Sequence, residues 1–173
     1  GKQMSDLEGV LRHFTKQIPA ARNMNYWDRL KFMNMNSEQR RMERYRILYV
    51  WKILQGLVPN PGIEELTANE NRGRRCIVPF TRNKKRLESF NVIGPKLFNN
   101  LPKELRNMKC VLEDFKISLD TFLMCVPDEP PCPGLVPGAT DMILSKPSNS
   151  LLHQVQRAWR EGLLSGWRDQ IKI

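Results

Sequence analysis

Residues 37–55 read SEQRRMERYRILYVWKILQ, and this stretch indicates the fold class. Ser37 is a typical helix N-cap, and Glu38 lies in the first turn, where a negative charge is favourable. Apolar residues recur at helical spacing as far as Leu54, and the second half of the stretch is apolar on nearly all sides. A helix of this kind must be buried on several sides. The pattern therefore predicts a central helix over 37–55, followed by Gly56 at the C′ position, where glycine is favoured because it adopts the left-handed conformation.

Similar patterns on both sides of this helix predict a mainly α-helical chain. The stretch 5–18 begins with a capping-box pattern, Ser5 followed by Glu8, and carries one apolar face. That face consists of Leu7, Val10, Leu11, Phe14 and Ile18. Pro102 suits the first position of a short helix, because the N–H that proline lacks would have no partner there. The other helical segments are expected at 25–33, 95–100, 103–108, 111–125 and 150–164.

Two short strands are expected between the central helix and the second half of the chain. They cover 76–80 and 87–93, and Gly94-Pro95 would end the second one. The connection 81–86 contains four cations, so a basic run would lie at the tip of a β-hairpin. A two-stranded hairpin is not stable alone, so it must pack against the helices.

Prolines divide the last part of the chain. The stretch 127–137 contains five prolines, which predicts an extended linker. The expected organisation is a helical domain with one hairpin at 1–126, a proline-rich linker at 127–149 and a C-terminal helix at 150–173. That last helix carries an apolar stripe, which either packs on the main body or binds a partner. The stripe consists of Leu151, Val155, Trp159 and Leu163.

The charge of the chain favours a polyanionic partner. The 173 residues include 28 Lys and Arg against 18 Asp and Glu, a net charge of +10, and the first 90 residues carry +9 of it. The densest run, 72–86, holds seven cations and no acid. These cations could contact nucleic-acid phosphates, or they could pair with acids and lie over aromatic rings. The candidate nucleic-acid contacts are Arg40, Arg41, Arg44, Arg72, Arg74, Arg75, Arg82, Lys84, Lys85 and Arg86.

Several aromatic residues have two possible roles as well. They could stack on bases, but their helical spacing with Leu and Met favours a place in the core. They are Tyr26, Trp27, Tyr45, Tyr49 and Trp51.

The sequence predicts no catalytic residues, no metal ligands and no cofactor. His13 and His153 lie in no catalytic or zinc signature, and there is no glycine-rich phosphate loop. The four cysteines, at 76, 110, 125 and 132, do not have zinc-ligand spacing and are expected to be reduced thiols. No apolar stretch approaches the length of a membrane helix, and the first residues do not resemble a signal peptide. A nuclear or cytoplasmic protein that is not secreted and makes no membrane contact is therefore expected.

Seven short blocks occur in a recognisable order. The first is LRHFTKQIP at 11–19, and YWDRL at 26–30 follows it. The central helix then contributes SEQRR with Tyr45, and YVWKILQG at 49–56. The last blocks are Arg72-Gly73, then Ser89-Phe90 with KLFNNLP at 96–102, and finally Phe115-Lys116 with Leu119-Asp120.

This order resembles the C-terminal region of reverse transcriptases from non-LTR retrotransposons, especially jockey-like elements of the LINE type. The resemblance covers residues 10–128, with Phe98 standing where the family carries Trp. It implies the thumb and the segment after it, which hold the template–primer duplex. The Tyr-x-Asp-Asp box of the polymerase site does not occur in the chain. The expectation is a non-catalytic domain that binds RNA or DNA backbone without sequence preference. The alternative is a domesticated protein-interaction or scaffold module that uses the C-terminal helix, through a partner or self-association.

Overall fold

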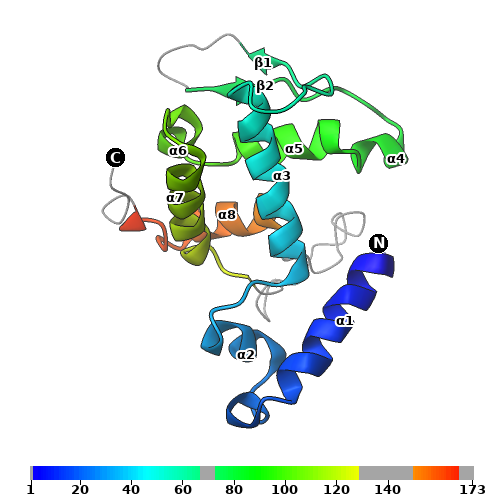
Figure 1. The fold of residues 1–173 in the computed structure, drawn as a ribbon, viewed down its shortest axis with the longest axis vertical. Coiled ribbons are helices and arrows are strands. Elements are labelled where there is room, and N and C mark those ends of the chain that lie inside the picture. The colour runs from blue at the N-terminus through cyan, green and yellow to red at the C-terminus, as the bar shows by residue number, and fades with distance from the viewer. Residues whose placement is uncertain (1, 67–72, 129–149, 168–173) are drawn as a thin grey trace.

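The central helix predicted from the sequence is α3 (Glu38–Leu54), around which the rest of the chain is arranged (Figure 1). The computed structural model describes residues 2–66, 73–128 and 150–167. Its elements before the hairpin are α1 (Lys2–Lys16), the 3-10 helix η1 (Pro19–Ala21), α2 (Tyr26–Phe32) and α3. The strands β1 (Glu65–Leu66) and β2 (Arg75–Cys76) follow. The remaining helices are α4 (Lys84–Leu87), α5 (Phe90–Asn99), α6 (Lys103–Asn107), α7 (Leu112–Met124) and α8 (Leu151–Arg160).

The predicted fold class, mainly helical with one two-stranded hairpin, is confirmed within the described residues. The predicted end signals of α3 are also confirmed. The Ser37 hydroxyl accepts a hydrogen bond from the backbone N–H of Arg40 at 3.1 Å. At the other end, Gly56 adopts a φ of +71°, the left-handed conformation that glycine accommodates best. None of the described helices is long and apolar enough to cross a membrane.

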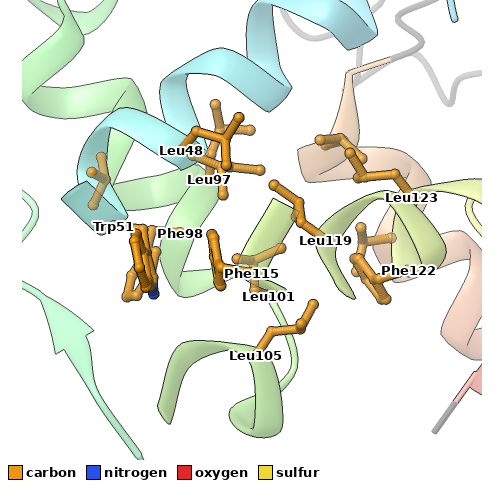
Figure 2. Close-up of a cluster of buried hydrophobic side chains, with 14 of the residues drawn as sticks. Leu48, Trp51, Leu97, Phe98, Leu101, Leu105, Phe115, Leu119, Phe122 and Leu123 are labelled. Atoms are coloured by element: carbon orange, nitrogen blue, oxygen red, sulfur yellow. The ribbon is translucent and has the colours of Figure 1, made fainter. Parts of the chain in front are cut away.

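The main core forms where α3 meets α5, α6, α7 and α8. Trp51 of α3 is 1% exposed and stacks on Phe115 of α7, with ring centroids 4.6 Å apart. Figure 2 shows leucine and phenylalanine side chains converging on this pair from several helices. From α8 and the turn after it, Leu151, Val155 and Trp167 join the same cluster. The last helix therefore shares the core of the main body.

The close approach of α3 and α5 depends on Gly94. A Cβ atom at this position would lie 2.9 Å from Cγ2 of Val50 and 3.2 Å from the ring of Phe90. Pro95 follows inside the helix and is buried. The prediction that Gly94-Pro95 ends a strand is therefore wrong, because both residues lie within α5. Proline removes one helical hydrogen bond here, and packing against α3 stabilises the helix in spite of it.

Replacement of Gly94 by Ala is expected to lower the free energy of unfolding by about 1–3 kcal/mol, because the added methyl overpacks the helix crossing. In a solvated helix the same change would be stabilising. Urea unfolding monitored by circular dichroism measures the effect. The double variant Gly94→Ala, Val50→Ala should lose less than the sum of its two single variants, since the second change makes room for the methyl. Strictly additive losses would contradict the proposed crossing.

The predicted location of the hairpin is wrong. The strands are 65–66 and 75–76, paired antiparallel with Glu65 opposite Cys76. The stretch 87–93 is helical apart from residues 88 and 89, and it contributes to α4 and α5. Its β-branched Val92 suggested a strand, yet Val92 is 2% exposed in α5, whose contact with α3 overrides local preference.

The hairpin packs on the helices, as expected, through bonds from side chains to the backbone of β2 and of Arg74, which precedes it. Asn99 of α5 accepts from the N–H of Cys76 and donates to its carbonyl, both at 2.8 Å. Asn107 of α6 accepts from the N–H of Arg74 at 2.7 Å, and Arg106 donates to the Arg74 carbonyl. These side chains satisfy the backbone N–H and C=O groups on the edge of β2 that does not pair with β1. They therefore fix the position of β2 and the start of the segment that follows it.

The predicted start and apolar face of the first helix need correction. The helix begins at Lys2, so Ser5 is inside it rather than at its cap. The Glu8 carboxylate instead accepts from the backbone N–H of Glu38 at 3.0 Å and from the Tyr26 hydroxyl. Of the five face residues only Leu11 is buried, whereas Leu7, Val10 and Phe14 are exposed and Ile18 is half-buried. Within the described residues, α1 packs mainly against α2, η1 and α3, at the α2 end of the molecule, and these contacts leave the rest of its apolar face uncovered.

Candidate nucleic-acid interface

Arg40, a predicted phosphate contact, is a structural residue. Its side chain is completely buried, and its guanidinium donates to the carbonyl oxygens of Leu123 and Val126 at 3.4 Å and of Pro127 at 2.6 Å. The Asp128 carboxylate lies 3.9 Å from its Nε. Burial lowers the pKa of this guanidinium, and the charge of Asp128 opposes that shift. The prediction that Arg40 binds phosphate is wrong, because the side chain binds the C-terminal end of α7 instead.

The other two arginines predicted on this helix pair with acids. Arg44 bonds both carboxylate oxygens of Asp120, at 2.5 and 2.6 Å, and this hydrogen bonding raises the pKa of the guanidinium. Arg41 pairs with Glu38 at 3.2 Å and its side chain is 40% exposed. The alternative interpretation, in which cations pair with acids, therefore describes both residues.

Arg74 follows the same pattern on the hairpin. Its guanidinium bonds the Glu65 carboxylate at 2.6 and 3.1 Å and the carbonyl of Leu54 at 3.1 Å. That carbonyl belongs to the last turn of α3, where the helix dipole attracts a positive charge. Two further arginines, Arg29 and Arg106, are buried and donate to backbone carbonyls. Arg29 bonds those of Arg12 and Met24, and Arg106 bonds that of Leu101. Part of the charge excess thus stabilises helix C-termini.

Four of the candidate cations remain available to a ligand. Arg75, Arg82, Lys85 and Arg86 are exposed and form no ion pair within the described part of the chain. They follow one segment, 75–86, which runs from β2 to α4 at the end of the molecule opposite α2 (Figure 1). We call 75–86 the basic segment. Arg72 and the side chain of Lys84, which were also predicted contacts, lie outside what the structure describes.

The backbone of the basic segment is held by short-range hydrogen bonds. Asn83 caps α4, since its side chain accepts from the N–H of Lys85 at 3.0 Å. The Thr81 hydroxyl accepts from the N–H of Asn83 at 3.2 Å, and the Ser89 hydroxyl donates to the carbonyl of Arg86 at 2.7 Å. At its other end the segment is anchored by β2. The four cations are therefore carried on a chain segment with a defined course.

Phe80 is a surface residue that the sequence interpretation missed. Its side chain is 86% exposed, and the guanidinium carbon of Arg82 lies 5.8 Å from the ring centroid. The sequence placed it in a strand at 76–80, where it would pack in the hairpin. Pro79 directly before it and the basic run directly after it were the available signals for an exposed ring.

The predicted aromatic residues divide between core and surface. Trp51 and Tyr26 are buried, so the core interpretation holds for both, and Trp27 packs edge-on against Tyr26. Tyr49 is 42% exposed and contacts the ring of Phe90, with centroids 5.3 Å apart. Tyr45 is exposed below the guanidinium of Arg44. None of the five lies in the basic segment.

The three described cysteines form no disulfide, and burial lowers the reactivity of their thiols. Burial raises the pKa of the Cys76 thiol to about 11 and also raises the pKa of Cys110 and Cys125. A protonated thiol is a poor nucleophile and a poor metal ligand. Within 2–66, 73–128 and 150–167, no three His, Cys, Asp or Glu side chains are grouped as a metal site requires. Cys132 lies outside these ranges.

The predicted partner-binding stripe on the last helix is only half available. Leu151 and Val155 are each 2% exposed in the core, so the prediction that they bind a partner is wrong. They are buried because α8 packs against the main body. Trp159 and Leu163 are 45% and 49% exposed, and a partner role for these two stays a prediction.

Comparisons of the chain with protein-family models, with curated proteins and with solved structures find no match. The function must therefore be inferred from the chain's own residues.

Proposed function

We propose that the chain is a non-catalytic module that binds the backbone of RNA or DNA without reading its sequence. The observation that carries this proposal is the basic segment, where Arg75, Arg82, Lys85 and Arg86 are exposed and have no acidic partner among the described residues. Uncompensated cations at a surface attract a polyanion, and their side chains are suited to phosphate oxygens. The resemblance to a reverse-transcriptase thumb region agrees with this function.

The burial and pairing of the other arginines limit the size of the contact. Arg40 is buried, and Arg41, Arg44 and Arg74 already have carboxylate partners. An ion-paired arginine gains less from a phosphate, because it must first leave its acid. The proposal therefore involves about four phosphates, which is fewer than the sequence alone suggested.

A salt titration directly tests the number of phosphate contacts. Four phosphate contacts predict that the affinity for an oligonucleotide falls about a hundredfold between 50 and 200 mM salt. Fluorescence anisotropy of a labelled oligonucleotide, measured at several salt concentrations, gives the slope of log affinity against log salt. Absence of binding at 50 mM salt would refute the proposed function.

A pair of charge-matched variants tests the location. Arg82→Gln with Arg86→Gln should lower the salt slope by about 2 and weaken all sequences equally. Lys16→Gln with Arg22→Gln removes the same net charge from exposed positions near η1, far from the basic segment, and should change affinity only slightly. An equal loss in both variants would show attraction by net charge alone, with no role for the basic segment.

A further inference from the structure

Phe80 is the most exposed large hydrophobic side chain of the described residues. Its 86% exposure compares with 59% for Phe14 and 57% for Phe32, which lie on the surfaces of helices. Isolated exposed apolar residues are common, so exposure alone is not informative. What distinguishes Phe80 is its place within the basic segment, with the Arg82 guanidinium 5.8 Å from its ring.

An exposed ring beside unpaired cations matches the chemistry of a single nucleic-acid strand. Such a strand offers phosphates to the cations and flat, apolar base faces to the ring. In a duplex the base faces are stacked on each other, so the ring would find only sugars and groove edges. An apolar protein pocket would satisfy Phe80 but would give Arg82, Lys85 and Arg86 no partner of opposite charge.

We propose that Phe80 stacks on an unpaired base, and that the strand held by the basic segment is therefore single-stranded. This inference rests on the proposed function and adds the form of nucleic acid that is bound. The Thr81 and Asn83 side chains accept from the backbone N–H groups of Asn83 and Lys85, and these bonds hold the turn that joins the ring to the later cations. Phosphates on Lys85 and Arg86 would then follow a base on Phe80 along one strand.

Two oligonucleotides with equal charge test the stacking. Oligo-dT and an abasic strand of the same length carry the same phosphates, but only the first has bases. Stacking of one base predicts that oligo-dT binds about tenfold more tightly than the abasic strand at a fixed salt concentration. The variant Phe80→Leu should abolish this preference by weakening oligo-dT binding, with the abasic strand unchanged.

The controls separate stacking from general effects on the surface. Phe32→Leu removes an exposed ring from α2 and should keep the preference for oligo-dT. Phe80→Trp should also keep it, because indole stacks on bases at least as well as a phenyl ring. The salt slope should be the same in all three variants, since no cation has been removed.

Failure of this inference is distinguishable from failure of the proposed function. If the two strands bind equally well and Phe80→Leu changes neither, the backbone function stands and the stacking is refuted. If a duplex of the same sequence binds more tightly than oligo-dT, the single-strand assignment is refuted as well. If neither strand binds at 50 mM salt, the proposed function itself is refuted.

Discussion

Replacing Arg40 with Met is expected to lower the free energy of unfolding by about 3–5 kcal/mol, the range for removing one partner of a buried charged pair. Methionine fills most of the volume of the arginine stem, so the loss comes mainly from polar contacts. The carbonyls of Val126 and Pro127 would lose the Arg40 donor and Asp128 its cation, whereas the Leu123 carbonyl would keep its bond from the N–H of Val126. Each carbonyl left unsatisfied in the interior adds its own desolvation cost.

The measurement is urea or thermal unfolding of Arg40→Met beside Arg41→Met. Arg41 precedes Met42 on the same helix and carries the same charge, but its pair with Glu38 is partly exposed. Its loss should cost less than about 1 kcal/mol, as for surface ion pairs. Under conditions where both variants are folded, Arg40→Met should leave the salt slope of oligonucleotide binding unchanged. A stable Arg40→Met variant with a reduced slope would show that Arg40 contacts phosphate after all.

The arginines show what a charge pattern can and cannot predict. The sequence correctly placed Arg40, Arg41 and Arg44 on one helix, since periodicity and the Ser37 cap are local signals. It could not tell that Asp120 and Asp128, about eighty or more positions later, would lie beside two of them. Ion pairs between distant segments depend on tertiary packing, which leaves no spacing signal in one sequence.

The hairpin shows a different limit. Its existence was predicted, but the strands were placed one segment too late, because Val92 and Ile93 have β-branched side chains. The structure pairs Glu65–Leu66 with Arg75–Cys76, two strands too short to leave an alternating pattern. They are positioned by Asn99 and its neighbours on the helices rather than by their own composition. Phe80 was missed for the same reason, since its exposure follows from where β2 ends.

The last helix was predicted from its sequence, but the residue that anchors its first turn was not predicted. Glu43 lies in the middle of α3 and is 2% exposed. Its carboxylate accepts from the Ser150 hydroxyl at 2.7 Å and from the N–H of Leu151 at 2.8 Å. A carboxylate at this position satisfies a free amide of the first turn of α8 and interacts favourably with the helix dipole.

Replacing Glu43 with Ala is therefore expected to cost about 3 kcal/mol, because a charged hydrogen-bond acceptor disappears and a buried N–H is left without a partner. The loss of stability should be greatest in α8. Its amides are expected to exchange with solvent faster than those of α3 and α7. The fluorescence of Trp167, which packs edge-on against Phe122 with centroids 5.3 Å apart, should shift toward that of an exposed indole. Because the chain has four tryptophans, the spectrum of a Trp167→Phe variant must be subtracted to isolate the signal of Trp167.

Glu38→Ala is the matched control, since it removes a carboxylate from the first turn of the same helix, where the partner Arg41 is partly exposed. It should cost less than about 1 kcal/mol and leave exchange in α8 unchanged. If Glu43→Ala destabilises the whole domain while α8 exchanges no faster than α3, the carboxylate stabilises α3 itself rather than the docking of α8. The basic segment contacts neither Glu43 nor α8 in any described bond, so oligonucleotide affinity should survive in Glu43→Ala. The docking of the last helix and the binding surface are then separable properties of one fold.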